Sequence, residues 1–147
     1  MIYEVRQNGY LISTDPEKID VELVHAYLSE SSYWAKNIPE EVVRKSIANS
    51  VCFGIYENGQ QKGFARVVTD KATFGYVADV FVVEASRGLG LSKWLMDSIL
   101  AHPELQGFRR WVLATADAHG LYARSGFKPL ANPGRWMELH NPDVYNP

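Results

Sequence analysis

The sequence predicts a mixed α/β fold of the α+β kind, with a mostly antiparallel central sheet flanked by helices. Two Asn-Gly pairs each separate short segments rich in β-branched and aromatic residues, a pattern typical of antiparallel hairpins. The second half instead alternates strand-like and helix-like segments, which favours a parallel neighbour at one side of the sheet. A length of 147 residues suits one domain covering residues 1–147.

The first third predicts a hairpin followed by two helices. Residues 2–6 and 10–13 flank Asn8-Gly9, and Thr14 or Asp15 followed by Pro16 is typical of a helix start. Apolar residues at spacings of three and four then follow as far as Tyr27. A second helix is expected to open at residues 37–40.

Three strands are predicted next, at residues 51–56, 62–68 and 74–83. Asn58-Gly59 joins the first two as a tight hairpin. The third strand ends in the continuous apolar run of residues 80–83, which favours a central strand covered on both faces.

The remaining elements are a helix, a strand, a short helix and a last pair of strands. The helix that follows the glycine-bearing turn starts at Leu91 and stops at His102-Pro103, because proline cannot extend a helix. A strand is expected at residues 110–115 and a helix at residues 117–125, with Gly126 as its left-handed cap. Residues 127–130 and 135–139 are then predicted to pair as strands.

Composition excludes several classes of function. Fifteen Lys and Arg against 17 Asp and Glu give a net charge of −2, so no global basic field attracts nucleic acid or a membrane surface. A single cysteine cannot form an internal disulfide. The N-terminus carries no signal-like apolar run, and we expect a cytoplasmic protein.

The turn after the third strand carries the clearest chemical signal. Gly88 and Gly90 lie where a helix begins, beside Arg87, so free N–H groups there predict a phosphate-binding nest. A dinucleotide fingerprint fails because Lys93 occupies its third glycine position, and the Walker A spacing is absent. A turn that merely uses glycine to fold back is the remaining alternative.

Two motifs resemble the GNAT N-acetyltransferase superfamily. Arg87-x-x-Gly90-x-Ser92 is similar to its R/Q-x-x-G-x-G/A signature, with serine in place of the usual glycine or alanine. Residues 118–127, AHGLYARSGF, resemble its A-x-x-L/F-Y-x-x-x-G-F element in the expected order. The resemblance implies the GNAT fold, acetyl-CoA as the acetyl donor, direct transfer to the amine of a small-molecule acceptor, and no metal.

The resemblance also implies which residues bind the donor. The backbone of the central strand would pair with the pantetheine arm, and the helix start would hold the pyrophosphate. Asp117 is expected either to contact the cofactor arm or to cap the short helix. The donor-binding candidates are Phe81, Val82, Val83, Arg87, Gly88, Leu89, Gly90, Leu91, Ser92, Asp117 and Tyr122.

Tyr122 and Asp79 are the catalytic candidates. Tyr122 matches the family tyrosine that acts as a general acid near the sulfur, although it could instead pack the helix against the sheet. Asp79 interrupts an apolar strand, which favours a base or an acceptor-orienting group. Pairing of Asp79 with Arg66 on the preceding strand is the alternative interpretation.

The acceptor is expected to contact the end of the first helix and the central strand, at Tyr33, Trp34 and Tyr76. The four histidines show no metal-ligand spacing, and Cys52 in a strand is typical of a core thiol. A homodimer through the sheet edge or the last strands would suit the family. A non-catalytic acyl-CoA-binding module on the same fold remains the alternative function.

Overall fold

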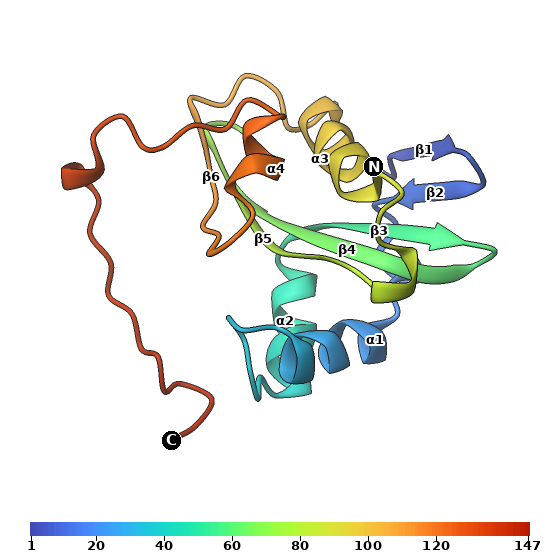
Figure 1. Ribbon diagram of the computed structural model, residues 1–147, viewed down its shortest axis with the longest axis horizontal. Helices are drawn as coiled ribbons and strands as arrows, with labels where there is room; N and C mark the ends of the chain where they lie inside the picture. Colours follow the sequence, from blue (N-terminus) through green and yellow to red (C-terminus); the bar gives the residue numbers. More distant parts are fainter.

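A computed structural model describes residues 1–147 and contains one six-stranded sheet with helices on both faces (Figure 1). The strands are β1 Glu4–Gln7, β2 Tyr10–Ser13, β3 Val51–Glu57, β4 Gln60–Thr69, β5 Phe74–Val82 and β6 Arg110–Val112. The α-helices are α1 Val21–Ala26, α2 Glu40–Ala48, α3 Leu91–Ala101 and α4 His119–Ala123. The predicted mixed fold with a mostly antiparallel sheet is confirmed.

The strands lie in the sheet in the order in which they occur in the chain. Every neighbouring pair is antiparallel except β5 and β6, which are parallel. Both predicted Asn-Gly turns have positive φ at both residues, 51° and 83° at Asn8-Gly9 and 51° and 78° at Asn58-Gly59. Such turns match the right-handed twist of hairpin strands, so local sequence alone determines the two hairpins.

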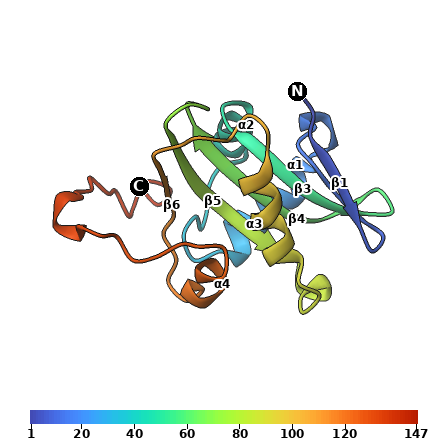
Figure 2. The same ribbon diagram turned by 90° about the horizontal axis from the view of Figure 1, so that it is seen from above.

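The sheet separates two apolar clusters. Helices α1 and α2 cover one face, and α3 and α4 lie over the other (Figures 1 and 2). Phe53 and Leu95 lie in the core on the α3 side, whereas Phe64 and Val43 lie in the core on the α1 and α2 side. Successive strand residues point to opposite faces, which is why neighbouring residues of β3 and β4 belong to different cores.

The first helix differs from the prediction at both ends. Asp15 caps only a short 3₁₀ turn, Pro16–Lys18, and α1 begins after Asp20, whose carboxylate accepts from Leu23 N at 3.1 Å. After α1 the chain widens into a π-type turn, Tyr27–Ser31. Asp15 and Asp20 explain the difference, because Asp15 caps the 3₁₀ turn and Asp20 caps α1, and each accepts from a free N–H group of the turn that it caps.

The predicted last strand pair is wrong. Residues 127–130 and 135–139 form no strand, and only the 3₁₀ turn Pro133–Arg135 is regular there. Residues 131–147, here called the C-terminal arm, leave the sheet beside β6 and return toward α1 and α2 (Figure 1). A strand needs a hydrogen-bonded neighbour, and the arm runs away from the free edge of β6 instead of along it.

The structure contains no helix with both the length and the apolar character that a membrane span requires.

Candidate active site

Strands β5 and β6 diverge and open a cleft between them. They pair only from Phe74 opposite Arg110 to Tyr76 opposite Val112. Beyond that point β5 continues to Val82, whereas the chain after β6 turns away through residues 113–118 toward α4. The edge of β5 that faces this opening therefore has no neighbouring strand over its second half.

A β-bulge at Asp79 bends β5 at the start of the cleft. Arg66 lies opposite Ala78 and Phe64 opposite Phe81, so Asp79 and Val80 together face the single residue Ala65. Asp79 has a φ of 54°, in the left-handed region that non-glycine residues rarely adopt. Bulges redirect side chains and increase local twist, and this one turns the end of β5 away from β6.

The backbone of Val82 points into the cleft. Val83 N donates to Lys62 O across β4 at 2.8 Å, so the N–H and C=O of the preceding residue face the opposite edge. The Val82 carbonyl accepts from Nε of Arg87 at 3.0 Å. The Val82 N–H remains as a hydrogen-bond donor directed toward the opening.

Arg87 therefore supports the strand end. Its guanidinium donates both to Val82 O and, through Nη2, to the hydroxyl of Tyr27 at 3.2 Å. The ring of Tyr27 in turn stacks on Phe81, with centroids 4.0 Å apart and planes 8° apart. This set of contacts links the glycine turn to β5 and to the end of α1.

The start of α3 presents a row of free N–H groups. The first N–H of this segment with a backbone acceptor is that of Trp94, which donates to Gly90 O at 3.2 Å, and those of residues 88–93 have none. Gly88 and Gly90 have φ values of 81° and 76°, and a Cβ at either would meet no atom within 4 Å. Glycine is required there by backbone conformation, and free N–H groups at the start of a helix are a feature that favours anions.

Tyr122 of α4 lines the cleft from the other side. Its side chain is buried, and burial raises the pKa of its phenol, with smaller contributions from Tyr33 and Asp117. A raised pKa keeps the hydroxyl protonated through the neutral range, so it can act as a hydrogen-bond or proton donor. Gly126, at φ 97°, ends this segment in the predicted left-handed conformation.

Asp79 is held from two sides. Nε of Arg66 lies 2.8 Å from one carboxylate oxygen, and the indole Nε1 of Trp34 donates to the other at 2.9 Å. The exposed fractions of the two charged side chains are 18% for Arg66 and 11% for Asp79. The pairing with Arg66, which the sequence left as an alternative, is present, and it fixes Trp34 as well.

One cavity of about 620 Å³ brings the predicted catalytic and acceptor-binding residues together. Tyr76 and Asp79 of β5 line it, as do Tyr33, Trp34 and Tyr122. Asp117 also lines the cavity and does not cap α4, whose N-cap is Ala118 without a side-chain bond. The donor-binding candidates Phe81–Val83 and residues 87–92 do not line it. They follow beyond Val80, at the end of β5 and the start of α3.

The turn after α1 positions the aromatic pair. Ser32 N donates to Tyr27 O at 2.9 Å, and the Ser32 hydroxyl donates to Leu28 O and accepts from Ala35 N. This arrangement places Tyr33 and Trp34 at the cavity, with their rings edge to face and centroids 5.0 Å apart. The Tyr33 hydroxyl accepts from Ala116 N at 2.9 Å and thereby joins this turn to the loop after β6.

Cys52 and His102 do not line this cavity. Cys52 is buried, and burial raises the pKa of its thiol to about 12, which disfavours a nucleophilic thiolate. His102 is buried with Nδ1 accepting from Glu104 N at 3.0 Å, and burial lowers its pKa. No group of three or more potential metal ligands exists in the chain.

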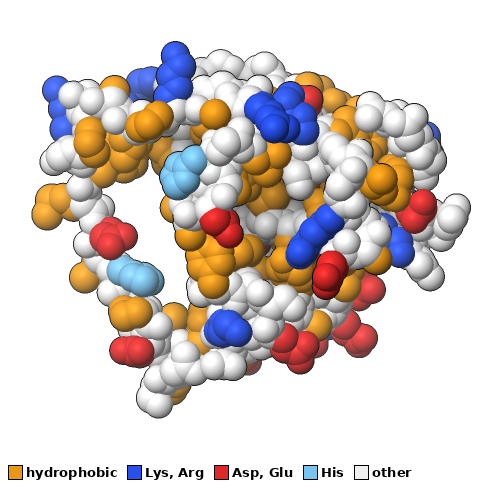
Figure 3. Space-filling view, viewed as in Figure 1, with side chains coloured by type: hydrophobic (Ala, Val, Ile, Leu, Met, Phe, Trp, Pro, Cys, Tyr) orange, Lys and Arg blue, Asp and Glu red, His pale blue; other side chains and the backbone are white.

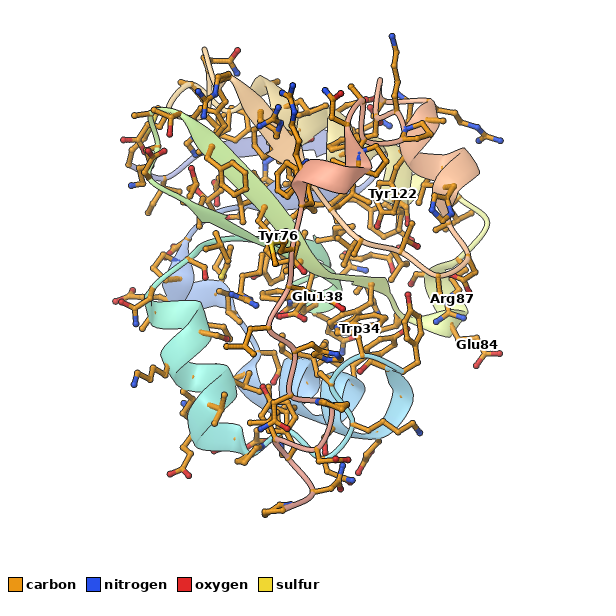
Figure 4. All side chains as sticks on the ribbon, turned by 90° about the vertical axis from the view of Figure 1, so that its left-hand side faces the viewer. Trp34, Tyr76, Glu84, Arg87, Tyr122 and Glu138 are labelled. Carbon is orange, nitrogen blue, oxygen red and sulfur yellow. The ribbon has the colours of Figure 1, made fainter.

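The C-terminal arm supplies lining residues that sequence reasoning missed. Glu138, His140 and Tyr145 line the same cavity, and Glu138 is labelled in Figure 4. Figure 3 shows acidic and histidine side chains along the arm, beside the open gap between the arm and the rest of the molecule. Tyr145 packs on the α1 and α2 core, and Asn37 donates to Asn146 at 2.6 Å. No local pattern indicates this role, because it depends on the path by which the arm crosses the open end of the cleft.

Comparison with known proteins identifies the family. Residues 48–129, more than half of the chain, match the family model described as "Acetyltransferase (GNAT) domain". A protein of Gibberella zeae named "Putative acetyltransferase FG08082" is 30% identical over 141 residues, which cover 81% of this chain and 78% of that protein.

Solved structures agree with this assignment. A Xanthomonas campestris protein described as an acetyltransferase of the GNAT family superimposes with a TM-score of 0.93 at 48% identity, covering 97% of this chain and 100% of that one. A Clostridium acetobutylicum acetyltransferase, solved with acetyl-CoA, shares the fold at a TM-score of 0.59 and 17% identity, covering 95% and 96% of the two chains. The chain belongs to the GNAT family of acetyltransferases.

Proposed function

We propose that this enzyme transfers the acetyl group of acetyl-CoA directly to the amine of a small-molecule acceptor. The observation that carries the proposal is the unpaired edge of β5, which opens between a row of free N–H groups at α3 and the hydroxyl of Tyr122. A thioester needs a narrow slot with backbone donors, and an amine needs access to it from the other side.

The donor end fits acetyl-CoA. The free N–H groups of residues 88–93 suit the pyrophosphate, and Arg87 holds the loop that carries them. The backbone of Phe81–Val83 pairs with the pantetheine arm in the manner of an added strand. Asp117 lines the adjoining cavity together with Asp79 and Tyr122.

Tyr122 and Val82 serve the reacting atoms. As the amine nitrogen bonds to the carbonyl carbon and the C–S bond breaks, the Val82 N–H donates to the carbonyl oxygen. The Tyr122 hydroxyl donates a hydrogen bond to the departing sulfur, which its raised pKa favours because the phenol stays protonated. The incoming ammonium loses one proton to water before it attacks. The nitrogen releases its second proton as the C–N bond forms, and this proton passes through water to the departing thiolate, so the products are the amide and the CoA thiol.

Asp79 acts as an acceptor-orienting residue. Both of its oxygens already accept hydrogen bonds, one from Arg66 and one from Trp34, so the carboxylate fixes the wall of the cavity. Tyr33, Trp34 and Tyr76 then provide the surface against which the acceptor packs. The sheet and its bulge hold these groups in place, and no metal is needed for the transfer.

Two measurements test the proposal. Calorimetry with acetyl-CoA should give binding in the micromolar range typical of enzyme substrates, of the order of 1–1,000 μM. A panel of amines with thiol detection should then show CoA release that depends on a particular amine. Absence of both binding at millimolar acetyl-CoA and amine-dependent CoA release would contradict the proposed function.

The arm and the free edge of β6 support a homodimer. Met137 and Leu139 are 96% and 104% exposed, and β6 has no neighbour on its outer side. A second copy would cover both features, since exposed apolar side chains and unpaired strand edges favour association. Light scattering should give twice the monomer mass of 16.6 kDa, and M137E combined with L139E should give the monomer. A monomeric wild-type protein would overturn this assignment.

A further inference from the structure

The charges around the acceptor end of the cavity are not balanced. Five of its lining residues can carry charge, namely Arg66, Asp79, Asp117, Glu138 and His140. Arg66 is the only arginine among them, and no lysine lines the cavity. Its guanidinium is already committed to Asp79 at 2.8 Å and to the Ser50 hydroxyl at 3.1 Å. Apart from His140, no other cationic side chain of the lining remains to bind an anionic group.

Two carboxylates remain unpaired after Asp79 is accounted for. Asp117 and Glu138 take part in none of the five ion pairs of the chain. His140 can contribute at most one positive charge, so the summed charge of the lining residues stays negative whether or not its imidazole is protonated. Glu138 comes from the exposed arm and is among the residues that line the cavity.

Aromatic rings form much of the remaining wall. Tyr33, Trp34 and Tyr76 are exposed by 57%, 43% and 38%, and all three line the cavity. The hydrogen bond from Trp34 to Asp79 holds the indole so that it cannot turn away. Aromatic faces attract organic cations and pack well against apolar bodies, whereas the negative face of a ring repels a carboxylate or a phosphate.

We infer that the acceptor is an amine without any anionic group, such as an arylalkylamine or an aliphatic diamine, and that Glu138 selects for its positive charge. This inference rests on the proposed function and narrows it to a substrate class. Amino acids and phosphorylated amino sugars are disfavoured, because their anionic groups would enter a cavity with two unpaired carboxylates and no free arginine or lysine. Like charges brought together in such a site repel each other.

Matched pairs of acceptors that differ by one carboxylate test the inference. Tryptamine is compared with tryptophan, phenethylamine with phenylalanine, and putrescine with ornithine, by kcat/KM with saturating acetyl-CoA. The amine without the carboxylate should be favoured by at least about tenfold in every pair that reacts. Calorimetry of the same pairs on the CoA-saturated protein provides a readout that does not depend on turnover.

Glu138→Gln removes the negative charge of this side chain and keeps its size and shape. The substitution should reduce the preference for tryptamine over tryptophan by at least about threefold. Asp143→Asn is the matched control, because Asp143 lies on the same arm and does not line the cavity. Acetyl-CoA affinity should remain unchanged in both variants, since neither residue is near α3.

The outcomes are distinguishable. Equal or better reaction or binding of the carboxylate-bearing members would overturn the charge preference and leave acetyl transfer intact. Equal effects of Glu138→Gln and Asp143→Asn would overturn the role of Glu138. If tryptamine binds more tightly than tryptophan although no amine is acetylated, the charge preference stands and the proposed function fails.

Discussion

The proposed donor end of the cleft offers backbone N–H groups, whereas the proposed acceptor end offers side chains from distant segments. The donor end comprises residues 81–83 and 87–92, which are nearly continuous in the chain. The acceptor end combines Tyr33, Trp34, Tyr76, Asp79 and Glu138, which span more than 100 residues. A group that all acetyl donors share can be bound by a short motif, whereas a particular acceptor requires a wall assembled by the fold.

The largest effect is expected where the two ends meet. Tyr122→Phe should lower kcat by about 100-fold, because it removes the donor to the departing sulfur. Acetyl-CoA affinity should change little, since the ring and its packing remain. Steady-state kinetics and calorimetry measure the two quantities separately.

Tyr56→Phe provides the control for this substitution. Tyr56 is also buried, but its hydroxyl has no hydrogen-bond partner and lies outside the cavity, so its loss should leave kcat unchanged. The raised pKa of Tyr122 further predicts that wild-type kcat shows no falling limb from this phenol below about pH 10. A falling limb that Tyr122→Phe abolishes would place its pKa lower and contradict the burial argument.

Asp79→Asn tests whether Asp79 positions the acceptor wall or removes a proton from the acceptor. The amide still accepts from Trp34 but loses the charge that pairs with Arg66. We expect KM for the amine to rise by about tenfold with a small change in kcat and an unmoved pH profile. Loss of the acidic limb of the kcat/KM profile would instead identify Asp79 as the base.

Gly90→Ala probes the donor end alone. Its φ of 76° makes a Cβ cost about 1–2 kcal/mol, so acetyl-CoA binding should weaken by about tenfold if the strain shifts the N–H groups. KM for the amine should not change. Gly107→Ala is the matched control, because Gly107 has a φ of 78° with open space around it and follows the C-terminal end of α3, whereas Gly90 precedes its N-terminal end. It should lower the melting temperature without affecting acetyl-CoA affinity.

The smallest effect is expected at the turn between β4 and β5, away from the cleft. The Asp70 carboxylate accepts from the N–H groups of Ala72, Thr73 and Phe74, chiefly that of Thr73, and these bonds hold its pKa well below the usual range. A lowered pKa in the folded state gives stability that is present above about pH 4 and is lost as the pH falls further. Asp70→Asn should lower the urea midpoint slightly at pH 7, and the difference should shrink at pH 3. A constant difference would show that charge is not the cause.

Local sequence predicts the parts of this protein that depend on backbone conformation. The Asn-Gly hairpins, the stop of α3 at His102-Pro103 and the left-handed Gly126 were predictable because each follows from the φ preferences of one or two residues. The glycine turn was predictable for the same reason. The start of the first helix was not, because Asp15 and Asp20 both offer caps and only packing selects between them.

The acceptor wall was only partly predictable. Tyr33, Trp34 and Tyr76 were identified through the resemblance to GNAT proteins, and the structure places all three at one cavity. The hydrogen bond between Trp34 and Asp79 joins residues 45 positions apart, and no local pattern indicates it. Glu138 was missed because residues 135–139 read as a strand, whereas the arm leaves the sheet.

The sequence by itself determined the mixed fold, the hairpins and the anion-binding turn at the start of α3, because these depend on neighbouring residues and on backbone geometry. Only the tertiary structure decided how β5 and β6 diverge, which side chains face the opening, and where the C-terminal arm runs. Those features depend on packing between elements far apart in the chain. The charge at the proposed acceptor end therefore depends on the tertiary structure, because only the fold decides which charged side chains line the cavity.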